Sequence, residues 1–217
     1  MQAGVNEGRV ILVNKPVGWT SFDIVNKIRY KLKVKKVGHA GTLDPLASGL
    51  LIVCTGNKTR EIEQFMGMEK EYTGTLTLGA TTPSHDLETE VEPAGDPSAI
   101  DPEQIKSAAA HFTGAISQVP PTYSAVKVGG KRAYLMARKG RAFDLPPRQV
   151  HIHTFEITQI DLPVVTFRIV CSKGTYIRSL ARDFGDYLKV GAYLSGLCRT
   201  KIGPYRLDDA SEIDAIA

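Results

Sequence analysis

Short apolar runs, separated by segments with helical spacing, constrain the fold of this 217-residue chain more than any other feature. LLIVCTG at 50–56 is apolar without alternation, which indicates a buried strand. RVILVN at 9–14, VHIHTFEI at 150–157 and PVVTFRIVC at 163–171 also indicate strands. KEYTGTLTLG at 70–79 alternates between threonines and larger apolar residues, as a half-buried strand does.

YSAVKVGGKRAY predicts a hairpin turning on Gly129-Gly130, and KTREIEQFM and AYLMARKG predict short helices. Three longer segments also predict helices. Thr20 or Ser21 is expected to cap the first, over 21–32, and its apolar positions are Phe22, Val25, Ile28 or Arg29, and Leu32. Asp101 followed by Pro102 predicts the start of the second. The third covers GTYIRSLARDFGDYL, with Tyr176 and Arg178 at its N-terminal edge, off the apolar stripe. With no internal repeat or low-complexity linker, the sequence predicts one α+β domain with a mixed, mostly antiparallel central sheet flanked by helices.

Charge is distributed very unevenly along the chain. Residues 1–60 carry 10 basic and 3 acidic residues, 61–120 carry 2 and 11, and 121–217 carry 15 and 9. Basic segments attract polyanions, although a single basic run such as KIRYKLKVKK is more often the solvated side of a helix. Charge alone therefore leaves nucleic-acid binding open.

Several other classes of protein are disfavoured. No long apolar segment predicts a membrane span and no signal peptide is evident, so a cytoplasmic protein is expected. Cys54, Cys171 and Cys198 form no CxxC pair, and the five histidines are not spaced as ligands. We expect neither a disulfide framework nor a metal site.

One acidic residue, Asp44, stands within GHAGTLDPLASG at 38–49, directly before the buried strand. A carboxylate must be ionised to act as nucleophile or base, and a nearby guanidinium such as that of Arg178 would favour the ionised form. Tyr72 could stack on a ring and exchange a proton. Each residue also has a structural explanation: Asp44 could cap a turn, Tyr72 could belong to the core, and Arg178 could balance Asp183 or Asp186.

The combination is more specific than its parts. NKPVGWTS, GHAGTLDPLASGLL, KEYTGTLTLG, FTGAISQVPPTYSAVKVGGKRAYLMARKG and CSKGTYIRSLARDFG occur in this order. Together they resemble the bacterial tRNA pseudouridine-55 synthase (TruB-type) family, from about residue 9 to the DDA at 208–210. The resemblance implies the pseudouridine synthase catalytic fold.

It also implies a reaction and a site. Uracil would be cut from its ribose at N1, rotated and rejoined through C5, after the base has left its stack. Asp44 would be the catalytic aspartate, Tyr72 the active-site tyrosine and Arg178 the arginine paired with the carboxylate. Substrate-binding positions implied by the resemblance are His39, Tyr176, Leu197 and Lys15, the last with a structural or phosphate-binding role. No cofactor is implied, and three roles of Asp44 stay open: attack on C1′, addition to C6, and removal of the 2′ proton.

The expected partner is the T-arm stem-loop of tRNA, bound by a monomer without membrane or obligatory protein partner. An RNA-gripping insertion is expected around 123–147. The lysines and arginines expected along the RNA are Lys31, Lys33, Lys35, Lys36, Lys127, Lys131, Arg132, Arg138, Lys139 and Arg141. Two departures from the family pattern stand out: we expect no C-terminal PUA domain, and the loop that keeps Asp86 has Pro83 and Thr89 where relatives differ.

Two other functions share part of this pattern. A guide-directed rRNA pseudouridine synthase has the same aspartate motif but depends on accessory domains and partners. A non-catalytic tRNA-binding chaperone would need none of Asp44, Tyr72 and Arg178. Retention of these three residues favours the enzyme.

Overall fold

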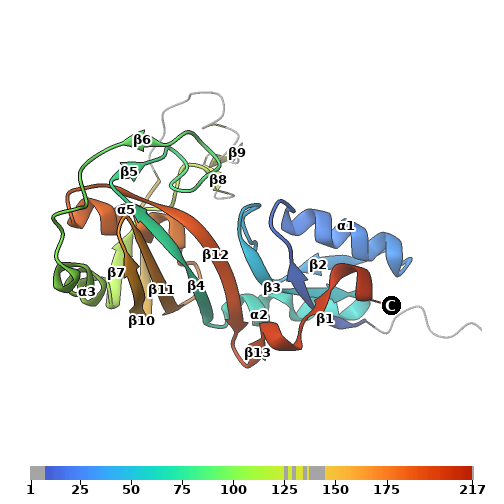
Figure 1. The fold of residues 1–217 in the computed structure, drawn as a ribbon. Helices are drawn as coiled ribbons and strands as arrows, with labels where there is room; N and C mark the ends of the chain where they lie inside the picture. The colour runs from blue at the N-terminus through green and yellow to red at the C-terminus, as the bar shows by residue number, and fades with distance from the viewer. Residues whose placement is uncertain (1–7, 125–126, 129–130, 134–135, 137–144, 217) are drawn as a thin grey trace, which may run out of the picture. The chain divides into compact units, whose positions relative to one another are not determined.

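The computed structural model describes residues 8–124, 127–128, 131–133, 136 and 145–216 (Figure 1). The chain divides into two compact units, Met1–Thr73 with Leu197–Ala217 (unit 1) and Gly74–Gly196 (unit 2). Two strands, β4 (Lys70–Leu78) and β12 (Ala192–Ile202), have residues in both. Among the described residues, no helix is long and apolar enough to span a bilayer.

Unit 1 has the strand order β14-β1-β3-β12, with β2 beside β3 and β13 beside β12. β1 runs antiparallel to β3, whereas β14 pairs with β1 and β12 pairs with β3 in parallel, so the sheet is mixed. The bounds of the strands are β1 Val10–Lys15, β2 Val37–His39, β3 Ser48–Thr55, β13 Tyr205–Arg206 and β14 Ser211–Glu212. The helices are α1 Ser21–Lys31, α2 Ile62–Gly67, and the short 3-10 segments η1 Gly56–Glu61, η2 Leu207–Asp209 and η3 Ile213–Ala215.

Two apolar clusters explain why β3 is apolar from Leu50 to Cys54. Leu51 and Val53 pack with Ile24 and Ile28 of α1 on one face. Leu50, Ile52 and Cys54 pack with Phe65 of α2 and Ile202 on the other face. Because successive side chains of a strand point to opposite faces, a strand covered on both sides has no polar position to alternate. This double cover fixes β3 and the loop that enters it.

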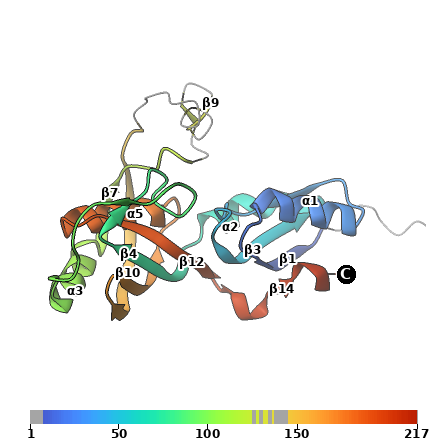
Figure 2. The same cartoon turned by 45° about the horizontal axis from the view of Figure 1, so that its top comes forward.

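Unit 2 has the strand order β12-β4-β11-β10-β7 (Figure 1, Figure 2). The pairs β10–β11 and β10–β7 are antiparallel, and α3 and α5 pack together near β10, where the ring centroids of Phe155 and Phe184 lie 5.4 Å apart. The remaining bounds are β5 Ala80–Thr81, β6 Glu92–Pro93, α3 Pro102–His111, β7 Gly114–Gln118, β8 Lys127–Val128, β9 Lys131–Arg132, β10 Arg148–Asp161, β11 Val164–Cys171 and α5 Ile177–Tyr187.

The structure confirms the predicted α+β class and the mixed, mostly antiparallel sheet. The predicted hairpin is confirmed by the β8–β9 register, Lys127 opposite Arg132 and Val128 opposite Lys131. The helix predicted over AYLMARKG, and much of the insertion expected around 123–147, lie outside the described residues.

One predicted core position is wrong. Phe22 is 60% exposed. Ile24 of α1 is fully buried instead, together with Val25 and Ile28. At 3.6 residues per turn, Phe22 lies about a third of a turn away from the face defined by Ile28. Val25 and Ile28 are buried as predicted, so the prediction of the helix is confirmed, and only the position of one edge of its buried face is wrong.

The start of α1 predicts a measurable stability change. Thr20 Oγ1 accepts a hydrogen bond from Asp23 N at 3.1 Å, and Asp23 Oδ2 accepts one from Thr20 N at 2.8 Å, which makes a capping box. We expect Thr20→Ala to lower the free energy of unfolding by about 1 kcal/mol, measured by urea denaturation. Thr20→Ser keeps the hydroxyl and should recover most of the loss. Equal losses for both variants would contradict the cap.

Candidate active site

Asp44 lies in the loop between β2 and β3 of unit 1, and its residue is half-buried. The loop leaves β2 through Ala40, whose N–H donates to Ile52 O at 2.8 Å. It closes in a tight turn in which Ala47 N donates to Asp44 O at 3.1 Å. The carboxylate is therefore carried by a short turn that enters the most buried strand of the unit.

Two buried side chains hold the backbone of this loop. Ser21 Oγ accepts from Leu43 N at 2.9 Å and donates to Leu43 O at 3.1 Å, which ties the residue before Asp44 to the start of α1. Arg199, 1% exposed on β12, donates from Nε to Leu50 O at 2.8 Å and from Nη2 to Gly41 O at 3.1 Å. The sequence offered Ser21 only as a possible helix cap and gave no role to Arg199, because their partners here are backbone groups that leave no pattern in the sequence.

Lys15 holds the other side of the loop. Its side chain is fully buried, and Nζ donates to Trp19 O at 2.6 Å, Pro16 O at 2.9 Å and Pro45 O at 3.4 Å. Gly18 N also donates to Pro45 O, at 2.8 Å. The sequence left Lys15 with a structural or a phosphate-binding role. Full burial and three carbonyl acceptors favour the structural role.

The position of Lys15 also affects its titration. Burial lowers its pKa from 10.5 to about 8; the Asp44 carboxylate opposes this shift, and the Arg199 guanidinium adds to it. A lysine whose pKa is lower in the folded state than in the unfolded state destabilises the folded protein at pH values where it is protonated in both states. The penalty is full below about pH 8 and disappears as the pH rises toward 10.5.

We therefore expect the stability of the wild type to rise with pH relative to Lys15→Met. From pH 7.5 to pH 9.5, the difference in free energy of unfolding between the two proteins should move in favour of the wild type by about 2 kcal/mol. Urea denaturation of both proteins at both pH values measures it, and other titrating groups cancel in the difference. A flat or falling difference would mean that Asp44 keeps Lys15 charged despite its burial.

His39 ends β2, opposite Val53 of β3. Its Nδ1 is buried and has no hydrogen-bond partner among the described residues. Burial is the main cause that lowers the pKa of His39, and Arg199 lowers it further.

Tyr72 and Leu197 occupy the unit 1 portions of β4 and β12. Tyr72 is 8% exposed, and Leu197 is half-buried. The neighbouring Glu71 accepts from Thr200 Oγ1 at 2.8 Å and from Lys201 Nζ at 3.3 Å, so the start of β4 is tied to β12 by side chains as well.

Arg178 belongs to unit 2, in the first turn of α5. It is 3% exposed; Nε lies 3.5 Å from Asp86 Oδ2, Nη1 donates to Ser84 O at 3.2 Å, and Nη2 donates to Tyr123 O at 2.9 Å. Asp86 is 5% exposed. The sequence had offered Asp183 or Asp186 as structural partners of Arg178, but Asp183 accepts from Arg182 Nη2 at 2.6 Å instead. Asp86 is an ion-pair partner of Arg178. The sequence analysis identified Asp86 only as a loop residue shared with the family.

Tyr176 precedes α5, and its backbone is held by one buried side chain. Gln118, fully buried at the end of β7, donates from Nε2 to Tyr176 O at 3.0 Å and accepts from Tyr176 N at 2.8 Å. The guanidinium carbon of Arg148 lies 5.3 Å from the centroid of the Tyr176 ring, a cation–π distance. Sequence reasoning missed Gln118 and Arg148.

The predicted residues thus fall into two groups. Unit 1 contains Lys15, His39, Asp44, Tyr72 and Leu197, and unit 2 contains Tyr176 and Arg178. Within unit 1, Lys15 and Asp44 are close enough to interact electrostatically. The pairing of Arg178 with Asp44 stays a prediction.

Comparison with known proteins defines the class to which this fold and these residues belong. The model of the TruB family pseudouridylate synthase N-terminal domain matches residues 29–177, which include Asp44, Tyr72 and Tyr176. The protein is a pseudouridylate synthase. More particularly, the chain belongs to the TruB family.

Curated relatives match over nearly their whole length. A protein of Phocaeicola vulgatus named tRNA pseudouridine synthase B is 51% identical over 215 residues, covering 96% of this chain and 92% of the relative. Proteins of the same name from Parabacteroides distasonis and Chlorobaculum tepidum are 53% and 48% identical, covering 93% and 97% of this chain and 88% and 90% of their own lengths.

Solved structures confirm the pseudouridine synthase fold. A chain in a crystal structure of a Cbf5-Nop10-Gar1 complex is 32% identical with a TM-score of 0.75; the match covers 97% of this chain and 54% of that one. The present chain thus spans about half the length of that solved chain. A structure described as a pseudouridylate synthase matches at 20% identity and a TM-score of 0.50, which supports the fold alone.

Proposed function

We propose that this protein converts a uridine in the T-loop of tRNA to pseudouridine, with Asp44 as the catalytic group. The observation that carries the proposal is the support of the Asp44 loop by buried side chains. Ser21, Lys15 and Arg199 hold backbone groups at Leu43, Pro45 and Gly41. A catalytic group acts well only when its geometry is set before the substrate binds, and this loop has such support.

The reaction rearranges bonds within one nucleotide. The N1–C1′ bond breaks, a C5–C1′ bond forms, C5 loses its hydrogen, and N1 gains a proton. An ionised carboxylate can serve attack on C1′, addition to C6 or removal of the 2′ proton. No redox step or group donor is required, so we expect the reaction to proceed without a cofactor.

The other residues serve to hold the base and the carboxylate. We assign Tyr72 to stack on the flipped ring, and Tyr176, Leu197 and His39 to contact it or the adjacent RNA. Arg178 would keep the Asp44 carboxylate ionised, and its fixed guanidinium suits a second acidic partner better than a lysine would. Lys15 would act through the loop that it holds.

The comparisons support tRNA as the substrate class. Relatives about 50% identical are named tRNA pseudouridine synthase B, which favours tRNA over guide-directed rRNA as substrate. We expect a cytoplasmic monomer that needs no partner protein. A pure tRNA chaperone would require neither a braced carboxylate nor a buried Arg178–Asp86 pair.

Mapping the product tests the substrate assignment. An unmodified tRNA transcript is incubated with the protein, and pseudouridine is located by carbodiimide labelling and primer extension. A single stop in the T-loop is expected, which a T-loop uridine-to-cytidine transcript should abolish. Modification of an rRNA fragment but not of tRNA would move the assignment to the other substrate class.

A further inference from the structure

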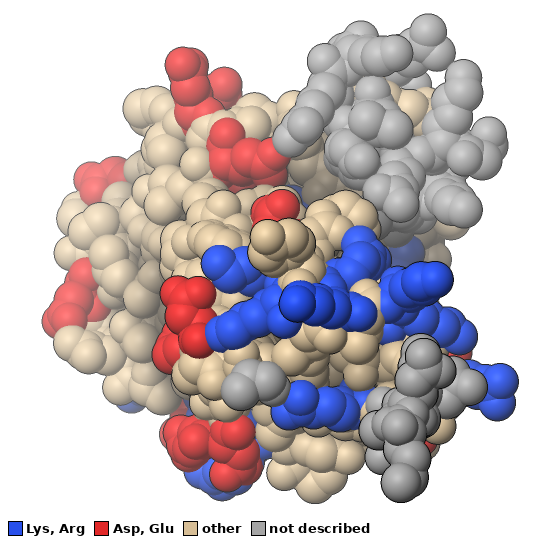
Figure 3. All heavy atoms as spheres, turned by 90° about the vertical axis from the view of Figure 1, so that its right-hand side faces the viewer, with Lys and Arg blue, Asp and Glu red and all other residues tan. Residues whose placement is uncertain are grey.

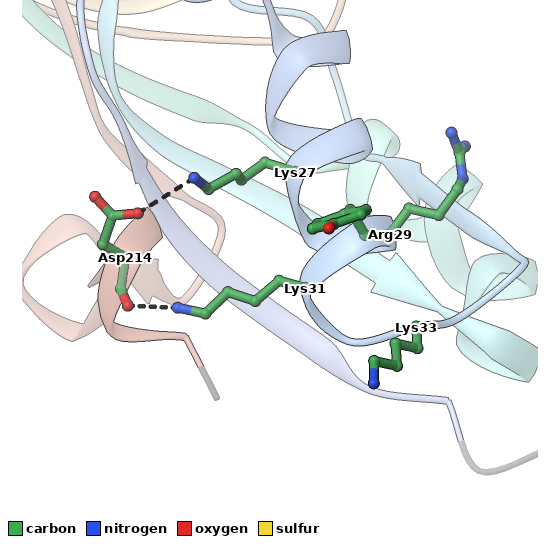
Figure 4. Close-up of a pocket in the computed structure, with 6 residues that line it drawn as sticks. Lys27, Arg29, Lys31, Lys33 and Asp214 are labelled. Atoms are coloured by element: carbon green, nitrogen blue, oxygen red, sulfur yellow. Dashed lines mark hydrogen bonds and ion pairs between the residues drawn. The ribbon is translucent and has the colours of Figure 1, made fainter.

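A groove lies at the C-terminal end of α1 in unit 1 (Figure 4). It encloses about 630 Å³ and is lined by Lys27, Arg29, Tyr30, Lys31, Lys33 and Asp214. α1 lies on the right-hand side of Figure 1, the side that faces the viewer in Figure 3, where Lys and Arg side chains gather. Four of the six lining residues are cations and one is an acid.

The acid compensates only part of this charge. Asp214 Oδ1 lies 3.6 Å from Lys27 Nζ, and the Asp214 backbone carbonyl accepts from Lys31 Nζ (Figure 4). Arg29 donates from Nη1 to the neutral Asn26 side chain at 2.6 Å. The groove therefore keeps a strong positive charge.

The end of α1 positions one of these four cations, Lys33. Lys33 has a left-handed backbone, with φ of 52°, and its N–H donates to Tyr30 O at 3.3 Å, while Val34 N donates to Arg29 O at 3.2 Å. Glycine or asparagine usually occupies this helix-ending position. A lysine there adds charge where a smaller residue would suffice.

An exposed aromatic ring distinguishes the groove from an ordinary solvated helix face. Tyr30 is 86% exposed and lies among these cations. Aromatic side chains interleaved with cations are typical of surfaces that follow a nucleic-acid backbone and stack on a base.

The groove is distinct from the Asp44 loop. Ser21, at the start of α1, contacts Leu43, whereas the groove lies at the other end of the helix. The eleven residues from Ser21 to Lys31 span about 15 Å of helix. A ligand in this groove therefore lies away from the end of α1 that contacts the Asp44 loop.

We propose that this groove binds the phosphate backbone of the substrate RNA at a site separate from the one that holds the target uridine. The inference rests on the proposed function for the identity of the RNA. Binding here is electrostatic and independent of sequence, because the lining offers cations and one aromatic ring but few groups that read base edges. It adds affinity without touching the reacting atoms.

A charge-neutral variant tests the groove. Lys27, Arg29, Lys31 and Lys33 are replaced by Gln, and the matched control is Lys106→Gln with Lys189→Gln, two exposed cations of unit 2. Binding of unmodified tRNA is measured at several salt concentrations, and isomerisation at saturating RNA. We expect the groove variant to bind about 10- to 100-fold more weakly at 0.1 M salt and to lose about three units from the slope of log K against log salt. Its kcat should stay within about twofold of wild type.

The outcomes separate this inference from the proposed function. If the wild type isomerises tRNA but the groove variant binds with the same affinity and salt slope, the groove proposal is overturned and the proposed function stands. Absence of isomerisation by the wild type would overturn the function, whatever the groove does. A Tyr30→Ala variant should weaken tRNA binding about fivefold or more with an unchanged salt slope, and no weakening would remove the ring from the proposal.

Discussion

Arg178→Met is expected to lower the free energy of unfolding by about 3–5 kcal/mol, because it leaves Asp86 as a buried carboxylate without its guanidinium. It also removes the donors to Ser84 O and Tyr123 O. In the proposed mechanism it removes the cation that keeps Asp44 ionised, so kcat should fall by about 100-fold or more at a temperature where the variant is folded. Urea denaturation and single-turnover kinetics measure the two effects.

Two further variants make this prediction specific. Arg178→Met with Asp86→Asn should recover part of the stability, since no uncompensated charge is then buried, but none of the activity. Arg182→Met, on the same helix, removes a half-buried arginine whose partner Asp183 is also half-buried, and should cost about 1 kcal/mol or less. Equal stability losses for Arg178→Met and Arg182→Met would contradict the role of the buried pair.

Asp44→Asn is expected to lower kcat/KM by about 10³-fold or more, because an amide is neither a nucleophile nor a base at neutral pH. RNA affinity should change by about threefold at most, since the loop is braced through backbone groups of Leu43, Pro45 and Gly41. Gel-shift binding and single-turnover rates on the same tRNA measure both.

Asp209→Asn is the matched control, because it makes the same chemical change at an exposed carboxylate of unit 1. It should leave both rate and affinity unchanged. A rate for Asp44→Asn within tenfold of the wild type would place the chemistry on another residue.

Local pattern accounts for much of the fold. The apolar run of β3, the Thr20 and Asp101 caps and the stripe of α5 are all visible in the sequence, because each depends on neighbours a few residues away. β12 was not predicted: it pairs in parallel with β3, through Cys198 opposite Ser48 and Arg199 opposite Gly49, and no local period reports so distant a partner. Fold class was predictable, but the strand at the centre of the topology was not.

The candidate site divides in the same way. Asp44 was visible because a lone carboxylate in a loop of small residues, before a buried strand, is unusual in the sequence itself. The roles of Arg199 and Ser21 at the Asp44 loop, and of Gln118 at Tyr176, were not visible, because these side chains bind backbone groups that every residue has. Asp86 and Arg178 are charged residues from distant segments, and only the folded chain shows that they pair.

The most direct test of the account is release of tritium from tRNA labelled at uridine C5. Wild type and Asp44→Asn are incubated with this RNA in EDTA, without added cofactor. Formation of the C5–C1′ bond displaces the C5 hydrogen, so the wild type should release one equivalent of tritium per T-loop target uridine, and Asp44→Asn essentially none. Binding of the RNA by a folded wild type without tritium release would contradict the account, and equal release by both proteins would contradict the role of Asp44.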